Sequence, residues 1–174
     1  MFDVVDDQDR VIGRAPRHEV HARGLKHRAV HVLVFNRRGE LFVQKRSATK
    51  DTFPLCYDSS ASGHLNSGEE YDTGAARELR EELGLAIPAD LLRKHFKLNA
   101  CRETGWEFVW VYSLETDREP TIDPEEIVEG AFWPLDEVRR FIADHPQQCA
   151  PSFCRVFLEF ESRGPWSTGM TESA

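Results

Sequence analysis

The sequence predicts a single α+β domain in which a mixed β-sheet lies between helices. Three observations carry this prediction. The chain has 174 residues, a length that suits one hydrophobic core rather than two domains. Segments with the two-residue periodicity of strands alternate along the chain with segments of helical periodicity. One strand, residues 106–114, carries apolar side chains on both faces, so helices are needed on both sides of the sheet.

The first strands are expected near the N-terminus. Residues 4–5 and 10–12 flank the turn-rich residues 6–9, which predicts an opening β-hairpin. A longer hairpin follows, because residues 27–35 are rich in β-branched side chains and almost continuously apolar, and a turn then leads into residues 40–45, which alternate. Both hairpins precede the first predicted helix.

The strand at residues 106–114 and three amphipathic helices complete the predicted layers. One face of the strand carries Trp106, Phe108, Trp110, Tyr112 and Leu114, and the other carries Val109 and Val111. The apolar stripes of the helices are Tyr71, Ala75, Leu79 and Leu83; Leu135, Val138, Phe141 and Ile142; and Phe153, Val156, Phe157 and Phe160. We expect residues 1–162 to form the domain and residues 163–174 to form a flexible C-terminal tail.

Composition excludes several classes of protein. No apolar run approaches the roughly 20 residues of a membrane-spanning helix, and a formal charge of −8 disfavours nucleic acid as a partner. The acidic first residues lack the pattern of a secretory signal. The four cysteines, Cys56, Cys101, Cys149 and Cys154, lack CxxC spacing and suit reduced thiols. A cytoplasmic protein is therefore expected, and a phosphorylated ligand would need metal ions or a local basic patch.

The chemistry is concentrated in residues 63–85. Ser67 and Glu70 have the spacing of a capping box, which predicts a helix that begins at Ser67, and Gly84 is suited to end it. Helical spacing then places three carboxylates, those of Glu78, Glu81 and Glu82, on one patch. Carboxylates this close raise one another's pKa unless a cation neutralises them. Hard oxygen ligands of this kind suit Mg²⁺, with Mn²⁺ as an alternative.

This segment is identified as a Nudix box. Its fixed positions, G-x5-E-x7-R-E-U-x-E-E-x-G-U with U a bulky aliphatic residue, are Gly63, Glu69, Arg77, Glu78, Leu79, Glu81, Glu82, Gly84 and Leu85. The resemblance implies the Nudix α/β/α sandwich and cleavage of a diphosphate linkage with divalent metal. It implies that Glu78, Glu81 and Glu82 hold the metal, that the Gly63 carbonyl can join them, and that Arg77 orients the acids. For an isolated acidic run, the simpler reading is a solvated helix face.

Sequence outside the box resembles one branch of the superfamily, the isopentenyl-diphosphate isomerases. The stretch at residues 27–54 is similar to the isomerase segment before its box, and Arg46 and Lys50 fall where that enzyme binds its diphosphate. Ser62, however, stands where the isomerase has the cysteine that moves a proton. Because a serine hydroxyl is a far weaker acid than a thiol, with its reference pKa of about 8.5, isomerisation is the second choice.

The same branch has a second metal site built from histidines and glutamates. His21, His27 and His64 resemble its histidines, and Glu107 resembles a glutamate that binds metal there. The spacing of the first two histidines is one residue short, and Gly105 stands where a further glutamate is expected. The alternative is that His21 and His27 are surface histidines at a strand edge and that His64 merely follows the box glycine.

The sequence therefore predicts a Mg²⁺-dependent hydrolase of nucleoside di- or triphosphates or nucleoside diphosphate derivatives. Isomerase-like activity and a non-catalytic nucleotide-binding regulator are the alternatives. We expect Arg77, Glu81 and Glu82 to be catalytic and a small molecule to be the partner. The general base is open among Glu81, Glu107, Glu125 and Glu126. Four aromatic residues could stack on the nucleobase of a substrate or could belong to the core, namely Phe53, Tyr57, Trp106 and Trp110. The oligomeric state, the preferred nucleobase and the number of metal ions stay open.

Overall fold

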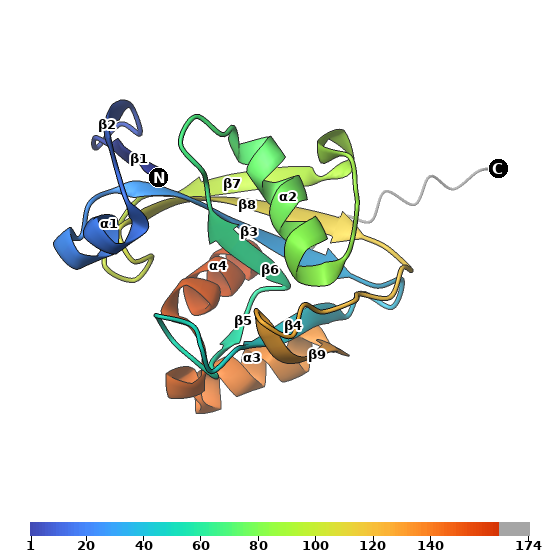
Figure 1. Cartoon of the computed structure of the whole chain (residues 1–174). Helices are drawn as coiled ribbons and strands as arrows, with labels where there is room; N and C mark the ends of the chain where they lie inside the picture. Colours follow the sequence, from blue (N-terminus) through green and yellow to red (C-terminus); the bar gives the residue numbers. More distant parts are fainter. Residues whose placement is uncertain (164–174) are drawn as a thin grey trace.

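The computed structural model describes residues 1–163 of the chain. A curved mixed sheet forms the middle layer, with helix α2 on one face and helices α3 and α4 on the other (Figure 1). This is the predicted α+β sandwich. The predicted tail falls almost wholly on residues 164–174, which lie outside the described residues. None of the described helices is long and apolar enough to cross a membrane.

Two long strands form the centre of the main sheet. Strand β3 (His27–Phe35) runs parallel to β8 (Glu107–Glu115), and β7 (Arg93–Leu98) pairs antiparallel with the far edge of β8. The other edge of β3 pairs with the short strand β6 (Ala61–His64). Strand β4 (Leu41–Arg46) then pairs with β5 (Tyr57–Asp58) and β9 (Ile127–Trp133).

The predicted hairpin over residues 27–45 forms only at its turn. Strands β3 and β4 pair at Phe35 and Leu41, and β4 then diverges because β6 occupies the edge of β3 from Ala29 to Val32. The side chain of Glu82 from α2 lies between β4 and β6, because its carboxylate accepts hydrogen bonds from Gln44 of β4 and from the backbone N–H of Ser62 of β6.

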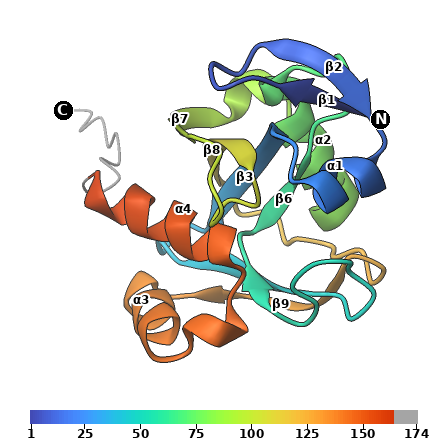
Figure 2. The ribbon, with the colours of Figure 1, turned by 90° about the vertical axis from the view of Figure 1, so that its left-hand side faces the viewer.

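The N-terminus forms a small unit beside the main sheet. Strands β1 (Phe2–Val5) and β2 (Val11–Ala15) pair as the predicted opening hairpin, and the short helix α1 (Arg17–Arg23), which the sequence did not indicate, follows it. Phe2, Ala15 and Val20 form a small hydrophobic cluster inside this unit. Figure 1 and Figure 2 show this hairpin and α1 grouped at one side of the molecule.

The three predicted helices are present. They are α2 (Tyr71–Leu83), α3 (Leu135–Asp144) and α4 (Pro151–Ser162), and the 3₁₀ turns η1 (Ala89–Leu91) and η2 (Pro146–Gln148) link neighbouring elements. Gly84 ends α2 with a positive φ of 65°, as expected. The predicted start at Ser67 is wrong, because its hydroxyl donates to Asp3 Oδ1 at 2.6 Å and α2 begins only at Tyr71.

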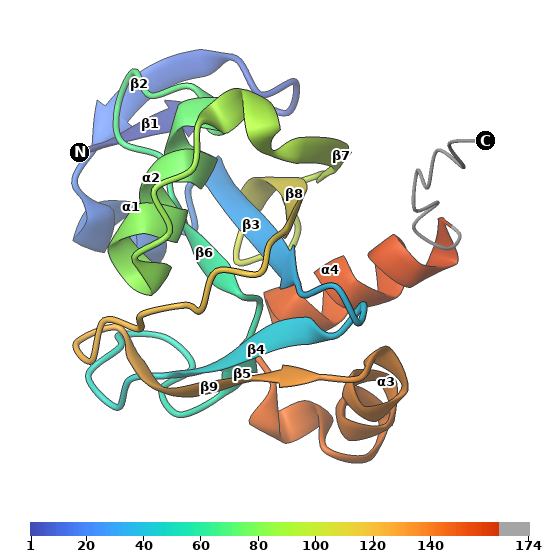
Figure 3. The ribbon, with the colours of Figure 1, turned by 90° about the vertical axis from the view of Figure 1, so that its right-hand side faces the viewer.

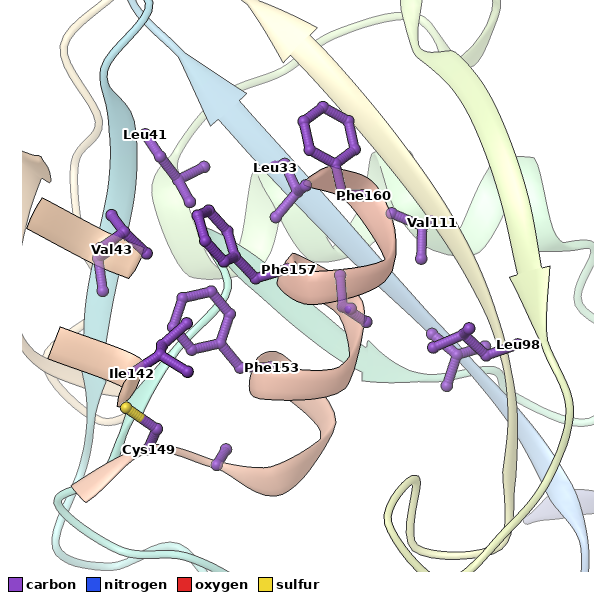
Figure 4. Packing of buried hydrophobic residues seen from close by; sticks show 14 of the residues in the cluster. Leu33, Leu41, Val43, Leu98, Val111, Ile142, Cys149, Phe153, Phe157 and Phe160 are labelled. Atoms are coloured by element: carbon purple, nitrogen blue, oxygen red, sulfur yellow. The ribbon is translucent and has the colours of Figure 1, made fainter. Parts of the chain in front are cut away.

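Two hydrophobic clusters hold these layers together. On one face of the sheet, alternate residues of β3 and β8, among them Leu33 and Val111, pack against Phe153 and Phe157 of α4 (Figure 4). On the other face, Tyr112 and Leu114 pack with the apolar stripe of α2. The two-faced pattern is therefore correct for β8, but Trp106 precedes the strand with a positive φ of 66° and is exposed. The four cysteines are free thiols.

Candidate functional site

A cleft of about 690 Å³ collects most of the polar residues that the sequence singled out. Its walls come from α1, β6 and α2, and from the loops at residues 47–56, 103–105 and 121–126. Figure 3 shows the first and last of these loops at the left of the view, below α1 and α2. The cleft therefore lies where the N-terminal unit, the box and two sheet-connecting loops meet.

The three box carboxylates lie together at the cleft but differ in burial. Glu78 and Glu82 are 8% and 3% exposed, whereas the side chain of Glu81 is 49% exposed. Burial, and then the proximity of Glu78, raises the pKa of Glu82 to about 8. Burial likewise raises the pKa of Glu78, against the effect of Arg77. The site therefore holds two carboxylates whose charged forms are costly without a further cation.

Arg77 ties the box together. Its guanidinium donates to Glu69 Oε1 at 2.8 Å, to Glu78 Oε1 at 2.7 Å and to Glu81 Oε2 at 2.9 Å. It also donates to the carbonyl oxygen of His64 at 2.9 Å. The guanidinium group of Arg77 thus contacts two of the candidate metal ligands and the segment that precedes the helix.

The backbone of β6 lies against the carboxylates. A Cβ atom at Gly63 would lie 2.1 Å from Glu78 Oε1, so only glycine allows this carboxylate its position. The neighbouring residue contributes as well, because the backbone N–H of Ser62 donates to Glu82 Oε2 at 3.2 Å. Gln44 of β4 donates to the same oxygen at 2.8 Å. The carboxylate of Glu82 thus lies between β4 and β6.

Cationic side chains line the cleft together with these acids. Arg46 donates to Asp58 Oδ2 at 2.8 Å, and Asp58 is buried. Lys50 pairs with Glu126 of the opposite loop. Burial lowers the pKa of Lys50. Arg17 of α1 also lines the cleft, and sequence reasoning missed it because α1 is too short to carry a clear apolar stripe.

Three histidines come together beside the carboxylates. Ring nitrogens of His21, His27 and His64 lie within 4.8 Å of one another, and Glu107 Oε1 lies 2.8 Å from His64 Nε2 and 3.5 Å from His27 Nε2. His27 is only 1% exposed. The alternative that these are surface histidines is therefore wrong for His27.

The pairing of β3 with β8 creates this cluster, because His27 stands directly opposite Glu107 in the parallel register. Burial lowers the pKa of His21 to about 4. Burial alone would raise the pKa of Glu107, but its interactions with His64 and His27 hold it well below the usual range. Within the described residues, His21 Nε2 and His27 Nε2 are buried without a hydrogen-bond partner. A charged carboxylate beside free imidazole nitrogens is a donor set that suits a divalent metal.

The aromatic candidates separate into two groups. Tyr57 packs against Trp133 and Phe141, and Trp110 packs against the cluster under α2, so both serve the core. Phe53 instead lines the cleft, is 48% exposed and has a positive φ of 49°. Trp106 is also exposed but packs on Gly24. All four candidates for the general base, Glu81, Glu107, Glu125 and Glu126, line the cleft.

Comparison with known proteins agrees with this geometry. Residues 25–153 match the model of the NUDIX domain. An uncharacterized Nudix hydrolase from Nostoc sp. is 37% identical over 134 residues, which cover 76% of this chain and 79% of the relative. The isopentenyl-diphosphate Delta-isomerase of Nocardia farcinica is 32% identical over 160 residues, which cover 88% of this chain and 90% of the isomerase.

A crystal structure shows the same fold. DR0079 from Deinococcus radiodurans superposes with a TM-score of 0.80 and 27% identity, over 91% of this chain and 97% of that protein. The main sheet and its helices are therefore an arrangement already known from a relative.

Proposed function

Because the chain belongs to the Nudix hydrolase family, whose enzymes act on pyrophosphate bonds and generally use divalent metal ions, we propose that it is a Mg²⁺-dependent hydrolase. Its substrates are nucleoside di- or triphosphates or nucleoside diphosphate derivatives, cleaved at a phosphoanhydride bond. The observation that carries the proposal is a single cleft in which three box carboxylates lie with Arg17, Arg46 and Lys50.

The residues present fit a divalent ion. Glu78 and Glu82 are buried side by side, and the raised pKa of each marks a cost that a cation would remove. Carboxylate oxygens and a nearby backbone carbonyl are the ligands that Mg²⁺ prefers. Glu78, Glu81 and Glu82, with the carbonyl of Gly63, would hold it. Bound Mg²⁺ supplies charge neutralisation and lowers the pKa of bound water.

The chain's own residues divide the remaining work. Arg46 and Lys50 bind the non-bridging oxygens of the diphosphate, and Arg77 keeps Glu78 and Glu81 oriented. Glu81, the most exposed of the three box acids, takes the proton of the attacking water as general base. The half-exposed ring of Phe53 can stack on the nucleobase or on another flat part of the substrate.

A substrate panel tests the proposal. Release of phosphate or nucleotide is measured from nucleoside di- and triphosphates and from nucleotide sugars, with and without Mg²⁺, for the wild type and Glu82→Gln. We expect release that requires Mg²⁺ and falls sharply in the variant. Release that is indifferent to Mg²⁺, or no release from any member, contradicts the proposal.

Isomerase-like activity is the second candidate, and specific observations favour it. The Nocardia isomerase is a relative over most of the chain, and the histidine cluster with Glu107 lies beside the diphosphate-binding candidates. Isomerisation is second because Ser62 stands where the isomerase has its proton-moving cysteine. The Ser62 hydroxyl lies 3.4 Å from the Asp58 carboxylate and is a far weaker acid than a thiol. Conversion of isopentenyl diphosphate with every nucleotide left intact would reverse the order. A nucleotide-binding regulator, the third candidate, requires nucleotide binding without turnover.

We also propose that the histidine cluster is a second metal site. The two unpartnered nitrogens, His21 Nε2 and His27 Nε2, are the observation that supports it. Glu107 and His64 complete the donor set. A small-molecule substrate, rather than nucleic acid or a membrane, and a cytoplasmic location stay predictions that rest on charge and composition.

A further inference from the structure

The contact between Arg17 and His64 fixes where one imidazole carries its proton. Arg17 Nη1 lies 2.9 Å from His64 Nδ1. A guanidinium can only donate hydrogen bonds, so Nδ1 must accept and therefore carries no proton. The ring of His64 then has its proton at Nε2, where it donates to Glu107 Oε1 at 2.8 Å. This tautomer follows from the partners alone.

His27 has the opposite arrangement. Its Nδ1 lies 2.8 Å from the carbonyl oxygen of Leu25, which can only accept, so Nδ1 carries the proton. In the neutral ring this leaves Nε2 unprotonated, and that atom is buried without a hydrogen-bond partner in the described part of the chain. A histidine that donates through one ring nitrogen to a carbonyl and keeps the other free is the usual form of a metal ligand. His27 is ready to bind metal, and His64 is not.

His64 could bind a cation beside Glu107 only through Nε2, the ring nitrogen that faces this carboxylate. It would first lose the Nε2 proton and gain one at Nδ1, with no net change in the proton count of the ring. The new N–H at Nδ1 would then point at the N–H groups of Arg17. Two donors repel each other, so Arg17 would have to leave.

Arg17 has a place to go within the same cleft. Its side chain is 41% exposed, and its Nε already lies 3.5 Å from Asp51 Oδ2 in the loop that carries Lys50. Arg17 and Lys50 line one cleft. An arginine released from His64 therefore adds a fork of donors where the diphosphate is expected to bind.

From this geometry we propose that Arg17 locks His64 in the tautomer that cannot bind metal, so that loading the histidine site and freeing Arg17 for the diphosphate are one coupled event. The proposal rests on the second metal site of the proposed function. Because coupling between two ligands is reciprocal, diphosphate also strengthens metal binding at the histidines.

Nuclear magnetic resonance of the imidazole nitrogens tests the lock directly. Wild-type protein is titrated with Zn²⁺, a diamagnetic probe, and ring ¹⁵N shifts distinguish a protonated Nδ1 from a protonated Nε2 for each histidine. We expect His64 to carry its proton at Nε2 without metal and at Nδ1 when Zn²⁺ is bound. A proton already at Nδ1 in the metal-free protein overturns the proposal.

Two variants test the role of Arg17. Arg17→Ala removes the lock, and Arg23→Ala is its matched control, because Arg23 lies on the same helix but pairs with Glu19 outside the cleft. We expect Arg17→Ala to bind Zn²⁺ at the histidines about tenfold more tightly, a difference of roughly 1.4 kcal/mol. We expect Arg23→Ala to bind as the wild type does. Equal affinities in the two variants overturn the lock.

The coupling is measured with inorganic diphosphate. Wild-type protein should bind it more tightly once Zn²⁺ occupies the histidines, and Arg17→Ala should lose this dependence while Arg23→Ala keeps it. If Zn²⁺ never perturbs the histidine signals, the second metal site and the coupling both fail. The box proposal is judged separately by Mg²⁺-dependent release, so its failure is distinguishable.

Discussion

The box carboxylates and the histidine cluster are neighbouring sites made in opposite ways. Glu78, Glu81 and Glu82 belong to one helix, α2, and helical spacing alone brings them together. His21, His27, His64 and Glu107 belong to four elements, α1, β3, β6 and β8, and only the fold brings them together. The first site carries an excess of negative charge, and the second has one carboxylate among imidazoles.

Their pKa values differ for the same reason. Burial, followed by a neighbouring carboxylate, raises the pKa of Glu82 to about 8, whereas histidines hold the pKa of Glu107 low against the effect of burial. A cation bound at the box would therefore relieve repulsion between carboxylates, whereas a cation bound at the histidines would occupy free ring nitrogens. The two groups of residues lining one cleft therefore favour different kinds of divalent ion.

The largest expected effect is at the box. Glu82→Gln removes the charge that this carboxylate would offer to a cation, while keeping an oxygen that can accept from Gln44 and Ser62. We expect kcat for Mg²⁺-dependent release to fall by about 10²–10³-fold, the typical loss when one electrostatic contact to the reacting centre is removed. A melting temperature close to that of the wild type is the control. Unchanged kcat would mean that the box is not the reactive centre.

Gly63→Ala tests the close approach of β6 to the box. The new Cβ would meet Glu78 Oε1 at 2.1 Å and displace this carboxylate. A displacement of about 1 Å can cost on the order of 100-fold in rate, and steady-state kinetics measures it. Gly13→Ala is the matched control, since a Cβ there meets nothing within 4 Å. Equal kinetics for the two variants would contradict the packing argument.

His27→Ala separates the two sites. The variant lacks the imidazole that offers a free Nε2, so we expect Zn²⁺ affinity at the histidines, measured by calorimetry, to fall by roughly 10–100-fold. Mg²⁺-dependent release should fall much less than in Glu82→Gln. Equal loss of release in both variants would mean that the two sites act as one.

The smallest effect concerns the N-terminal unit, which contributes His21 to the histidine site. Asp9 lies in the turn between β1 and β2, and its side chain is only 7% exposed. It accepts hydrogen bonds from Arg28 at 2.6 Å and from Tyr71 at 2.9 Å, and Lys97 pairs with it. Burial would raise the pKa of Asp9, but these partners lower it. Asp9→Asn should cost about 2 kcal/mol of unfolding free energy at neutral pH, measured in urea.

The contribution of Asp9 to the free energy of unfolding should depend on pH in a definite direction. A folded pKa below the unfolded value of about 3.9 means that the Asp9 charge stabilises the fold above that pH and loses its effect as pH falls through the folded pKa. The difference between wild type and Asp9→Asn should therefore shrink in acid. A loosened hairpin should weaken Zn²⁺ binding at the histidines before it affects the box. A constant difference across this range would contradict the role of the charge.

The box could be predicted from sequence because its contacts are local. One turn separates Glu78 from Glu82, and Gly84 ends the helix by its own conformational freedom. The start of α2 could not be predicted in this way. The capping side chain of Ser67 is taken by Asp3, a residue 64 positions away.

Long-range pairing explains the other differences. Nothing in residues 27–45 reveals that β6 takes the edge of β3, so the predicted hairpin was too long. The alternative of a surface histidine failed for His27 for the same reason, since the burial of His27 depends on β8. Arg17 went unnoticed because a helix of 7 residues has no room for a periodic stripe.

His27 and Glu107 are far apart in the sequence, and the parallel alignment of β3 with β8 places them next to each other in the sheet. An unfolded chain therefore cannot offer this pair to an ion, whereas the box acids stay adjacent in any helical turn. An ion bound at the histidines would accordingly stabilise the native pairing of the strands. The melting temperature should therefore rise with the concentration of excess Zn²⁺, because the ion binds the folded state and not the unfolded one.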